Sequence, residues 1–512
     1  MANISRTFSA ELDGIEAKLI EVETDINVGL HSFSIVGLAD KALTEAKERV
    51  NSALKNTGVK PPNRENRKIV VNLAPADIKK TGSQYDLAIA VAYLLATAQL
   101  KPCDSETMIF SGELSLEGKL RPIAGALSIA SLAEKTGKTL FIPKANAKEA
   151  GAVRGATIIP ITSLAELIHH LEKRSVIAPQ EPTNLEPENE TLFVKLSEIK
   201  GQASAKRALM IAAAGGHNML MVGPPGTGKT MLAQALASIL PEPAPEEMIE
   251  ITKVYSAANL LGDRGIIKNR PFRAPHQSAS PAAMVGGGQN PRPGEISLAH
   301  RGVLFLDELP EFRRDILESL RQPLESGRAI VSRVKNNLIF PARFMLVAAM
   351  NPCPCGYYGD EAKACTCAPY DVIRYNKKVS GPLLDRIDIQ ITVPRVSLET
   401  LQGKDTEQAL TDESAIKASI RKAHEIQKAR TAALKHKFRN SDLSSKECDE
   451  LITCDANAEQ FTKTVFDKAM LSARGYYRIL RVAQTIADLD ESPTVSANHL
   501  KEAFSYRLRE EA

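Results

Sequence analysis

The stretch Gly223-Pro224-Pro225-Gly226-Thr227-Gly228-Lys229-Thr230 decides the fold of this chain. It has the form G-x-x-x-x-G-K-[ST], which is typical of a phosphate-binding loop. The apolar run 219–222 before it predicts a buried strand, and the run 231–237 after it predicts a helix. Because the motif requires a strand before it and a helix after it, the stretch predicts a nucleotide site in an α/β sheet.

This loop has the groups that bind the phosphates of ATP. Its backbone N–H groups can point at phosphate oxygens, assisted by the N-terminus of the following helix. Lys229 places a charge on the β- and γ-phosphates, and Thr230 offers a hydroxyl to Mg²⁺. The expected cofactors are therefore ATP and Mg²⁺. The candidate ATP contacts are Gly223, Pro224, Pro225, Gly226, Thr227, Gly228, Lys229 and Thr230, with Gln202 at the opening of the preceding helix.

Polar residues follow the next two apolar runs, which predict buried parallel strands. Ligands of open parallel sheets bind at the carboxyl ends of such strands. The run 302–306 ends in Asp307 and Glu308, and the run 344–350 ends in Asn351. Asp307 is expected to hold Mg²⁺ through water, and Glu308 to polarise the attacking water. Asn351 fits a group that senses the γ-phosphate. The alternatives are an acidic strand end or helix cap for the carboxylates, and a turn residue before a proline for Asn351.

Length and composition limit the class of protein. A chain of 512 residues is too long for one core, and three domains are expected. The residues are 43% apolar and 25% charged, which is ordinary for a soluble protein. No apolar run approaches the length of a membrane helix, and the first residues lack the apolar core of a signal peptide. We therefore expect a cytoplasmic protein without a membrane partner.

The chain divides into three domains and one linker. Residues 1–173 predict a mixed α/β domain, with strands at 17–22, 68–73 and 139–143 and helices at 40–56, 86–95 and 123–135. Residues 174–195 are an acidic, proline-rich linker that we expect to bury no core. Residues 196–395 carry the phosphate loop and form the α/β motor. Residues 396–512 predict a helical lid.

The first domain resembles the C-terminal domain of the Lon protease family. The resemblance rests on the stretch 112–125 and on the residues around Lys80, Gly82 and Ser83. In the simplest register, the Lon serine falls on Gln84 and the Lon lysine on Leu127. Because leucine cannot act as a general base, the resemblance implies a Lon-like fold without peptidase activity.

The motor resembles AAA+ proteins related to magnesium chelatase, on the stretches 270–276, 286–297 and 381–388. The resemblance implies that Arg386 is an arginine finger, which reaches into the neighbouring subunit's site and stabilises charge in the transition state. The alternative is an Arg386 that pairs locally with Asp385 or Asp388. In the lid, the stretch 472–481 resembles the helix whose first arginine, here Arg474, contacts the γ-phosphate.

Basic residues gather on both sides of the second ATP motif. Residues 264–301 carry six Lys/Arg against one Glu, and residues 312–346 carry seven against three acidic residues. This favours an anionic partner such as DNA. The stretch 330–340 predicts a hairpin, and the resemblance places DNA contacts there and in the insert at 286–297. The expected contacts to backbone phosphates, independent of base sequence, are Arg333 and Lys335, then Arg273 and Arg292. A similar basic excess at 416–440 is more simply an exposed helix face.

Four of the seven cysteines form the pattern C-x-C-x9-C-x-C, at Cys353, Cys355, Cys365 and Cys367. Four thiolates are a reasonable ligand set for a structural Zn²⁺, although C-x-C is tighter than the usual C-x2-C. The alternative is a group of reduced thiols beside a glycine-rich turn.

Taken together, these stretches resemble the ComM/YifB type of bacterial magnesium-chelatase-like AAA+ ATPases over nearly the whole chain. The resemblance implies a homo-hexameric, ATP-driven DNA helicase that promotes branch migration on single-stranded or branched DNA during homologous recombination in natural transformation. Two other functions stay open: a chelatase-type ATPase that remodels a protein complex, and a Lon-like ATP-dependent peptidase.

Overall fold

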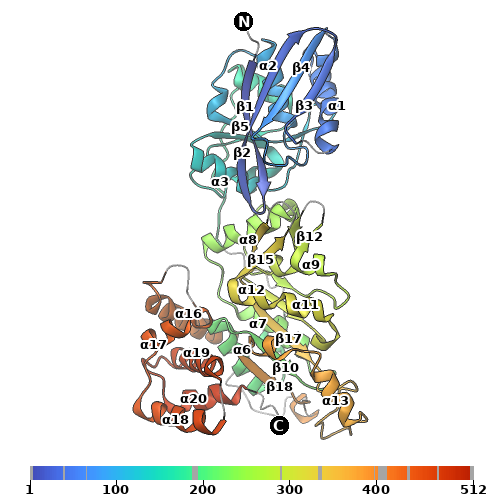
Figure 1. Cartoon of the computed structure of the whole chain (residues 1–512). Helices are drawn as coiled ribbons and strands as arrows, with labels where there is room; N and C mark the ends of the chain where they lie inside the picture. Colours follow the sequence, from blue (N-terminus) through green and yellow to red (C-terminus); the bar gives the residue numbers. More distant parts are fainter. Residues whose placement is uncertain are drawn as a thin grey trace.

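The computed structural model describes residues 4–38, 41–64, 66–186, 194–288, 291–332, 337–396, 398–401, 412–434, 439–469 and 472–507. Figure 1 shows three parts: an N-terminal domain, the motor below it, and a group of helices beside the motor. The expected α/β class and the helical C-terminal part are confirmed. Among the described residues, no helix has the length and apolar character needed to cross a membrane.

The first sheet of the N-terminal domain has the strand order β1-β2-β4-β3. Its strands are β1 (Ile4–Asp13), β2 (Glu16–Val28), β3 (Ser32–Val36) and β4 (Arg67–Ala74). Burial alternates along most of β2, so one face of the sheet meets the core and the other meets solvent. The helices α1 (Lys41–Asn56) and α2 (Asp86–Ala96) share their core with this sheet.

A second, parallel sheet has the order β5-β8-β9. Its strands are β5 (Met108–Phe110), β8 (Thr139–Pro143) and β9 (Ile158–Ile161). A small hairpin follows β5 and consists of β6 (Glu113–Leu114) and β7 (Leu120–Arg121). The helices of this half are α3 (Ala126–Thr136), α4 (Ala147–Ala150) and α5 (Leu164–Leu171). Helix α3 begins at Ala126, later than the expected residue 123, because Gly125 has a left-handed backbone (φ +76°) that a helix cannot include.

The proline-rich segment 174–186, part of the expected linker, lies against the N-terminal domain. The N–H of Gln180 donates to the carbonyl of Ile158 at 2.8 Å, and that of Thr183 to Gly151 at 2.9 Å. Leu185 is 7% exposed and packs in the core formed around α3. Extended backbone can pair with a strand end and bury one leucine even where composition is too polar for a core of its own.

The motor contains a five-stranded parallel sheet with the order β11-β14-β17-β10-β18. Its strands are β10 (Met219–Val222), β11 (Phe272–Arg273), β14 (Val303–Leu306), β17 (Met345–Met350) and β18 (Ile389–Thr392). Alternate residues of β10 belong to different cores, with Met219 and Met221 on one face and Leu220 on the other. The continuous apolar strands are therefore covered on both faces, as expected.

Helices and two hairpins surround this sheet. The helices are α6 (Ala203–Gly215), α7 (Lys229–Ile239), α8 (Pro245–Ala257), α9 (Pro281–Val285), α10 (Glu295–Leu298), α11 (Arg314–Ser319), α12 (Arg321–Ser326), α13 (Pro369–Asn376) and α14 (Gly381–Leu384). The hairpins are β12 (Gly286–Gly287) with β13 (Arg292–Pro293), and β15 (Arg328–Ser332) with β16 (Asn337–Pro341). The second of these confirms the hairpin expected at 330–340.

The C-terminal helices are α15 (Leu398–Leu401), α16 (Glu413–Arg430), α17 (Ser445–Leu451), α18 (Ala456–Ala469), α19 (Ala473–Leu489) and α20 (Ala497–Ser505). Apolar residues of α16 and α19 share one core with α6, α7 and the sheet. Buried hydrogen bonds also fix how α19 packs against the motor. The ring of His217 lies 2.8 Å from the hydroxyl of Thr485, on α19, and 3.3 Å from the carboxylate of Asp388.

The N-terminal domain is joined to the motor through α3, α8 and the turn between β1 and β2 (Figure 1). The side chain of Ile15, in this turn, packs against residues of α8 and against the core beneath the β15–β16 hairpin. The hydroxyl of Ser256, on α8, accepts the N–H of Gly125 at 2.9 Å and donates to the carboxylate of Glu149. Burial of apolar side chains together with satisfied polar groups makes this a specific contact.

Candidate functional site

The phosphate loop connects β10 to α7 at the C-terminal edge of the motor sheet. Gly226 and Gly228 have left-handed backbones (φ +78° and +84°), which glycine adopts without strain. No heavy atom lies within 4 Å of the position that a Cβ would take at either glycine. The loop backbone is therefore open on the side where a ligand can approach, which fits a bound phosphate chain.

Lys229 lies inside the loop and contacts the end of the neighbouring strand. Its ammonium group donates to the carbonyls of Gly223 at 2.7 Å and Pro224 at 2.9 Å, and to Oδ1 of Asn351 at 3.3 Å. Burial lowers the pKa of Lys229, while the charges of Asp307 and Glu308 act to raise it. The structure thus brings together two residues predicted separately, the phosphate lysine and the residue at the end of β17.

Thr230 and Asp307 form the second pair of the site. The Thr230 hydroxyl donates to Oδ2 of Asp307 at 2.9 Å, and the N–H of Glu308 donates to Oδ1 of the same carboxylate at 2.9 Å. A hydroxyl and a carboxylate at this distance suit the oxygen ligands that Mg²⁺ prefers. Glu308 has a left-handed backbone (φ +52°) and an exposed side chain, so its carboxylate is turned away from the buried strand β14 and accessible to water.

Gln202 lies close to the same loop through the end of β18. Its side-chain amide donates to the carbonyl of Pro394 at 2.7 Å, and its backbone is left-handed (φ +59°) at the start of α6. Val393, the residue before Pro394, passes close to Gly223 of the phosphate loop. A Cβ at Gly223 would lie 2.3 Å from the carbonyl oxygen of Val393. Gln202 therefore belongs to the wall beside the phosphate loop.

Arg386 follows α14 and is bound within its own chain. Its guanidinium donates to the carbonyl of Pro382 at 2.5 Å and forms an ion pair with Glu325 of α12. The side chain of Arg386 is 11% exposed, whereas that of Glu325 is 57% exposed. The alternative considered from the sequence was a local ion pair with Asp385 or Asp388. The observed partner is Glu325, which lies 61 residues earlier in the chain.

Arg474, the second residue of α19, is exposed. One turn later Arg478 faces inward, 3.8 Å from the buried carboxylate of Asp388. Burial alone would raise the pKa of Asp388, but a hydrogen bond from His217 and the charge of Arg478 bring it below its usual range. Among these arginines, Arg474 is accessible to a ligand, while Arg478 connects the lid to the motor.

Two of the candidate DNA contacts, Arg273 and Arg292, lie among the described residues of the motor. The hairpins are adjacent, since a Cβ on Gly286 of β12 would be 3.5 Å from Cγ2 of Val331 on β15. Arg292 of β13 is exposed. Arg273, in β11, forms a bidentate pair with Glu295 at 2.6 and 2.7 Å, so its charge is already neutralised. Arg333 and Lys335 fall outside the described residues.

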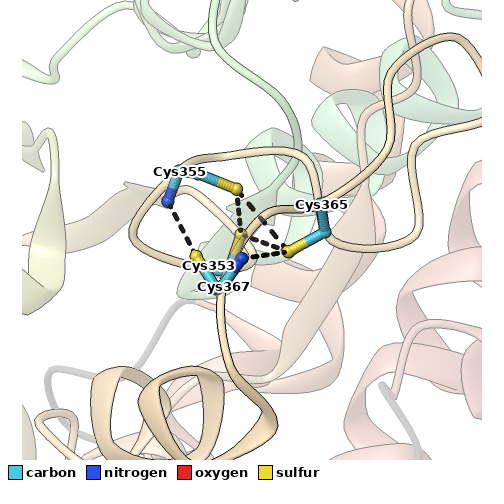
Figure 2. Close-up of side chains that lie close together, drawn as sticks. All are labelled: Cys353, Cys355, Cys365 and Cys367. Atoms are coloured by element: carbon cyan, nitrogen blue, oxygen red, sulfur yellow. Dashed lines mark hydrogen bonds between the residues drawn. The ribbon is translucent and has the colours of Figure 1, made fainter.

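The four cysteines of the C-x-C pairs come together in one loop after β17 (Figure 2). Their sulfur atoms all lie within 4.8 Å of one another. This is the one group of three or more potential metal ligands found among the described residues. The loop thus brings together four thiols that could hold a metal ion, as the spacing indicated.

Gln84 and Leu127 occupy the positions that the Lon resemblance assigns to the catalytic serine and lysine. The Gln84 amide donates to Glu11 at 3.0 Å and to the carbonyl of Thr81 at 2.8 Å. The side chain of Leu127 is fully buried in the apolar core around α3. Lys80 is also fully buried and donates to the carbonyl of Pro75. Leu127 and Gln84 cannot form a serine–lysine dyad.

Sequence reasoning missed the partners of several of these residues. Glu325 occurs in no recognisable motif, and Ser256 lies within an unremarkable helix. Glu295 lies in the stretch 286–297, but nothing in that stretch indicates its pairing with Arg273. Each meets its partner only because distant elements pack together, so no local pattern could have revealed them.

Comparisons with known proteins identify the family of the chain. Three family models match the chain: "Magnesium chelatase, subunit ChlI" at residues 195–401, "Subunit ChlI of Mg-chelatase" at 22–146 and "Magnesium chelatase, subunit ChlI C-terminal" at 411–507. The competence protein ComM of Haemophilus influenzae is 41% identical, with 99% of this chain and 97% of that protein aligned. The protein YifB of Escherichia coli is also 41% identical, over 96% of this chain and 95% of its own.

A more distant relative is the magnesium-chelatase 38 kDa subunit of Rhodobacter capsulatus, which is 26% identical over 61% of this chain and 87% of its own length. The relatives of the ComM/YifB type instead extend over the N-terminal domain, the motor and the lid together. The chain belongs to the ComM/YifB family of magnesium-chelatase-like AAA+ proteins.

Proposed function

We propose that this protein is a homo-hexameric, ATP-driven DNA helicase that promotes branch migration during homologous recombination in natural transformation. The observation that carries the proposal is the composite site in which Lys229 meets Asn351 and Thr230 meets Asp307. Such a site binds a nucleoside triphosphate and couples its γ-phosphate to a neighbouring strand. The competence protein among the relatives supports the cellular process, and the location that we propose is the cytoplasm.

In this proposal, each group of the site has one task. The loop 223–230 binds the phosphates, with Gln202 beside it, and Lys229 neutralises the β- and γ-oxygens. Thr230 and Asp307 would hold Mg²⁺, which when bound neutralises charge on the phosphates. Glu308 accepts a proton from the attacking water. Asn351 contacts the γ-phosphate from the end of β17.

Two arginines from outside the motor sheet complete the proposed site, one from the lid and one from the neighbouring subunit. Arg474 of α19 reaches the γ-phosphate from the lid. Arg386 leaves Glu325 and enters the site of the next subunit in the ring, where its planar charge stabilises the transition state. The exposure of Glu325 supports this exchange, because its carboxylate is 57% exposed and can be hydrated when Arg386 leaves it.

DNA is the partner that best fits the basic hairpin region. The proposed phosphate contacts are Arg333 and Lys335 in the β15–β16 hairpin and Arg292 in the β12–β13 hairpin. Arg273 ranks last, since binding a phosphate requires it to leave Glu295. These contacts are electrostatic and read no bases, so single-stranded or branched DNA of any sequence is expected to bind.

A second metal site is proposed in addition to the Mg²⁺ site. We propose that Cys353, Cys355, Cys365 and Cys367 hold one structural Zn²⁺, because four thiolates grouped this closely form a closed tetrahedral ligand set. The N-terminal domain is proposed to be Lon-like in fold and inactive as a peptidase.

The motor is tested by the rate of ATP hydrolysis with no DNA, with single-stranded DNA and with forked DNA. We expect DNA to raise the rate and Lys335→Glu to abolish that increase while leaving the DNA-free rate unchanged. Lys446→Glu is the matched control, since Lys446 is highly exposed on α17, in the lid. A strand-displacement assay on a four-way junction then tests branch migration directly.

A second candidate function, remodelling of a protein complex, is supported by the relative that is a magnesium-chelatase subunit. It predicts an ATPase rate that DNA does not change. An unchanged rate on both DNA substrates would therefore contradict the helicase and favour remodelling.

A further inference from the structure

The loop that carries the four cysteines also touches the ATP site. It begins two residues after Asn351, and Cys353 is fully buried. Its turn contains Gly356, whose backbone is left-handed (φ +86°). A Cβ at Gly356 would lie 2.6 Å from Cδ and 3.0 Å from Cγ of Pro225, a residue of the phosphate loop. The cysteine loop is therefore in direct contact with the segment that binds phosphate.

The spacing of the sulfur atoms fits a tetrahedral metal site. The Sγ of Cys353 lies 3.3 Å from that of Cys355 and 3.7 Å from that of Cys365, and Cys355 and Cys365 are 3.6 Å apart. Zinc with Zn–S bonds of about 2.3 Å requires sulfur-to-sulfur edges of about 3.8 Å. A disulfide would require a separation of about 2.05 Å. The observed distances are close to the metal value and far from the disulfide value.

Backbone N–H groups surround these sulfur atoms (Figure 2). The N–H of Cys355 donates to Sγ of Cys367 at 3.4 Å, and that of Cys367 to Sγ of Cys365 at 3.4 Å. The N–H of Tyr358 donates to Sγ of Cys353 at 3.3 Å. Hydrogen bonds of this kind stabilise metal-bound thiolates and fix their orientation. The loop thus supplies both the ligands and the surrounding donors of a zinc site.

Contacts outside the cysteines fix the far side of the loop. Asp360 pairs with Arg395, which follows β18, at 2.9 Å. The guanidinium of Arg395 also lies over the ring of Tyr357, 5.4 Å from its centroid, and Lys363 lies over the same ring at 4.1 Å. Because β18 is next to β10 in the sheet, the loop is attached to strands on both sides of the phosphate loop.

We propose that the zinc ion held by these cysteines sets the position of the phosphate loop relative to Asn351, and that ATP hydrolysis depends on it through the contact between Gly356 and Pro225. The proposal rests on the proposed ATP hydrolysis. Zinc bound by the four thiols would hold the loop 353–367 as one unit, which packs against Pro225 at Gly356 and begins two residues after Asn351. A shift of about 1 Å in such positions lowers an enzymatic rate by about 10²-fold.

The first experiment measures the metal itself. The full chain, purified without chelators, is expected to contain one zinc per chain by elemental analysis. Replacement by Co²⁺ is expected to give the absorption bands of tetrahedral thiolate coordination. The double variant Cys365→Ser/Cys367→Ser should lose both signals, and Cys103→Ser, in the N-terminal domain, should keep both. A wild-type chain that binds neither ion would overturn the proposal, whatever its ATPase rate.

The second experiment tests the contact while all four cysteines remain. Gly356→Ala is compared with Gly359→Ala, because both glycines are left-handed (φ +86° and +75°) in the same loop. A Cβ on Gly359 has no heavy atom within 4 Å, so this variant carries the backbone strain without the clash with Pro225. We expect both variants to keep their zinc, and Gly356→Ala alone to lower kcat for ATP, by about 10-fold.

The affinity for a fluorescent ATP analogue distinguishes a loss of hydrolysis from a loss of nucleotide binding. We expect Gly356→Ala to retain this affinity. Equal ATPase rates in the two glycine variants would overturn the coupling. An undetectable rate in the wild-type chain would instead contradict the proposed ATP hydrolysis and leave the zinc measurement standing.

Discussion

The ammonium group of Lys229 lies 3.3 Å from Oδ1 of Asn351, although the two residues are 122 positions apart in the chain. This contact links the start of α7 to the end of β17 at the edge of the sheet where ligands bind. Since Lys229 also donates to two carbonyls of its own loop, its position is fixed before any phosphate arrives. Catalysis benefits from such preorganised charge.

Replacing the strand-end partner should therefore affect hydrolysis more than binding. We expect Asn351→Ala to lower kcat for ATP by about 10²-fold, because one donor to the developing charge is lost. The affinity for a fluorescent ATP analogue should change little. Asn376→Ala, at the exposed end of α13, is the control and should behave as wild type. A large loss of affinity in Asn351→Ala would indicate a role in binding instead.

The pair of Arg386 and Glu325 leads to a test in mixed rings. From the proposed role as an arginine finger, Arg386→Ala should lower kcat by about 10³-fold or more with nucleotide binding retained. Glu325→Gln should retain hydrolysis, because the ion pair is given up when the finger enters its site.

Mixing inactive Arg386→Ala chains with inactive Lys229→Ala chains should restore activity, because about a quarter of the interfaces in a random ring have both groups intact. Mixtures that stay inactive would contradict a finger that acts between subunits.

The ion pair between Glu247 and Arg270 predicts a pH dependence of stability. The carboxylate lies 2.7 Å from a guanidinium that is 5% exposed. Burial alone would raise the pKa of Glu247, but the charges of Arg270 and then Arg439 lower it from 4.5 to about 2. Because the folded pKa is the lower one, the pair stabilises the fold above about pH 4.5, and this stabilisation is lost as the pH falls toward 2.

Glu247→Gln should accordingly lower the free energy of unfolding by about 3 kcal/mol at pH 7, since it leaves a buried guanidinium without its partner. The difference from wild type should shrink between pH 4.5 and 2, as measured by urea unfolding at several pH values. Glu246→Gln, at the exposed neighbouring position, should have no such effect. A difference that is the same at every pH would argue against the ion pair as its cause.

The contact between Ser256 and Glu149 predicts that the N-terminal domain and the motor unfold together. Glu149 is 4% exposed and also accepts the N–H of Leu127 at 2.9 Å. Ser256→Ala leaves this buried carboxylate and the N–H of Gly125 short of a partner, at a cost of about 1–3 kcal/mol.

Calorimetry should then resolve a separate, earlier transition for the N-terminal domain in Ser256→Ala. Ser445→Ala, at an exposed site on α17, should leave the wild-type profile unchanged. Separate transitions already present in wild type would contradict the coupling.

The N-terminal domain should have no peptidase activity. Leu127 is fully buried and offers no titrating nitrogen, so the position assigned to the Lon lysine cannot activate a nucleophile. We expect no cleavage of casein with ATP and Mg²⁺ present, as followed by release of labelled peptides, with a Lon protease as the positive control. Cleavage that survives Lys229→Ala but not Ser83→Ala would contradict this expectation.

The sequence by itself determined the features that depend on neighbouring residues. The phosphate loop, the apolar strands that end in Asp307 and Asn351, and the C-x-C pairs are all local patterns, because backbone conformation and ligand spacing are written within a few residues. The helix expected from residue 123 shows the limit of such patterns, since only the left-handed backbone of Gly125 moves its start to Ala126.

Only the tertiary structure decided which distant residues meet. Arg386 pairs with Glu325 and not with Asp385 or Asp388, the local partners that the sequence offered. Arg273 pairs with Glu295, a partner that the sequence did not indicate. The same holds for Leu185, which a polar segment buries against α3. Strand order and helix packing set these contacts, and they depend on the burial of whole faces of elements that lie far apart in the chain. A charge's partner is therefore a property of the packed fold and not of its neighbours in sequence.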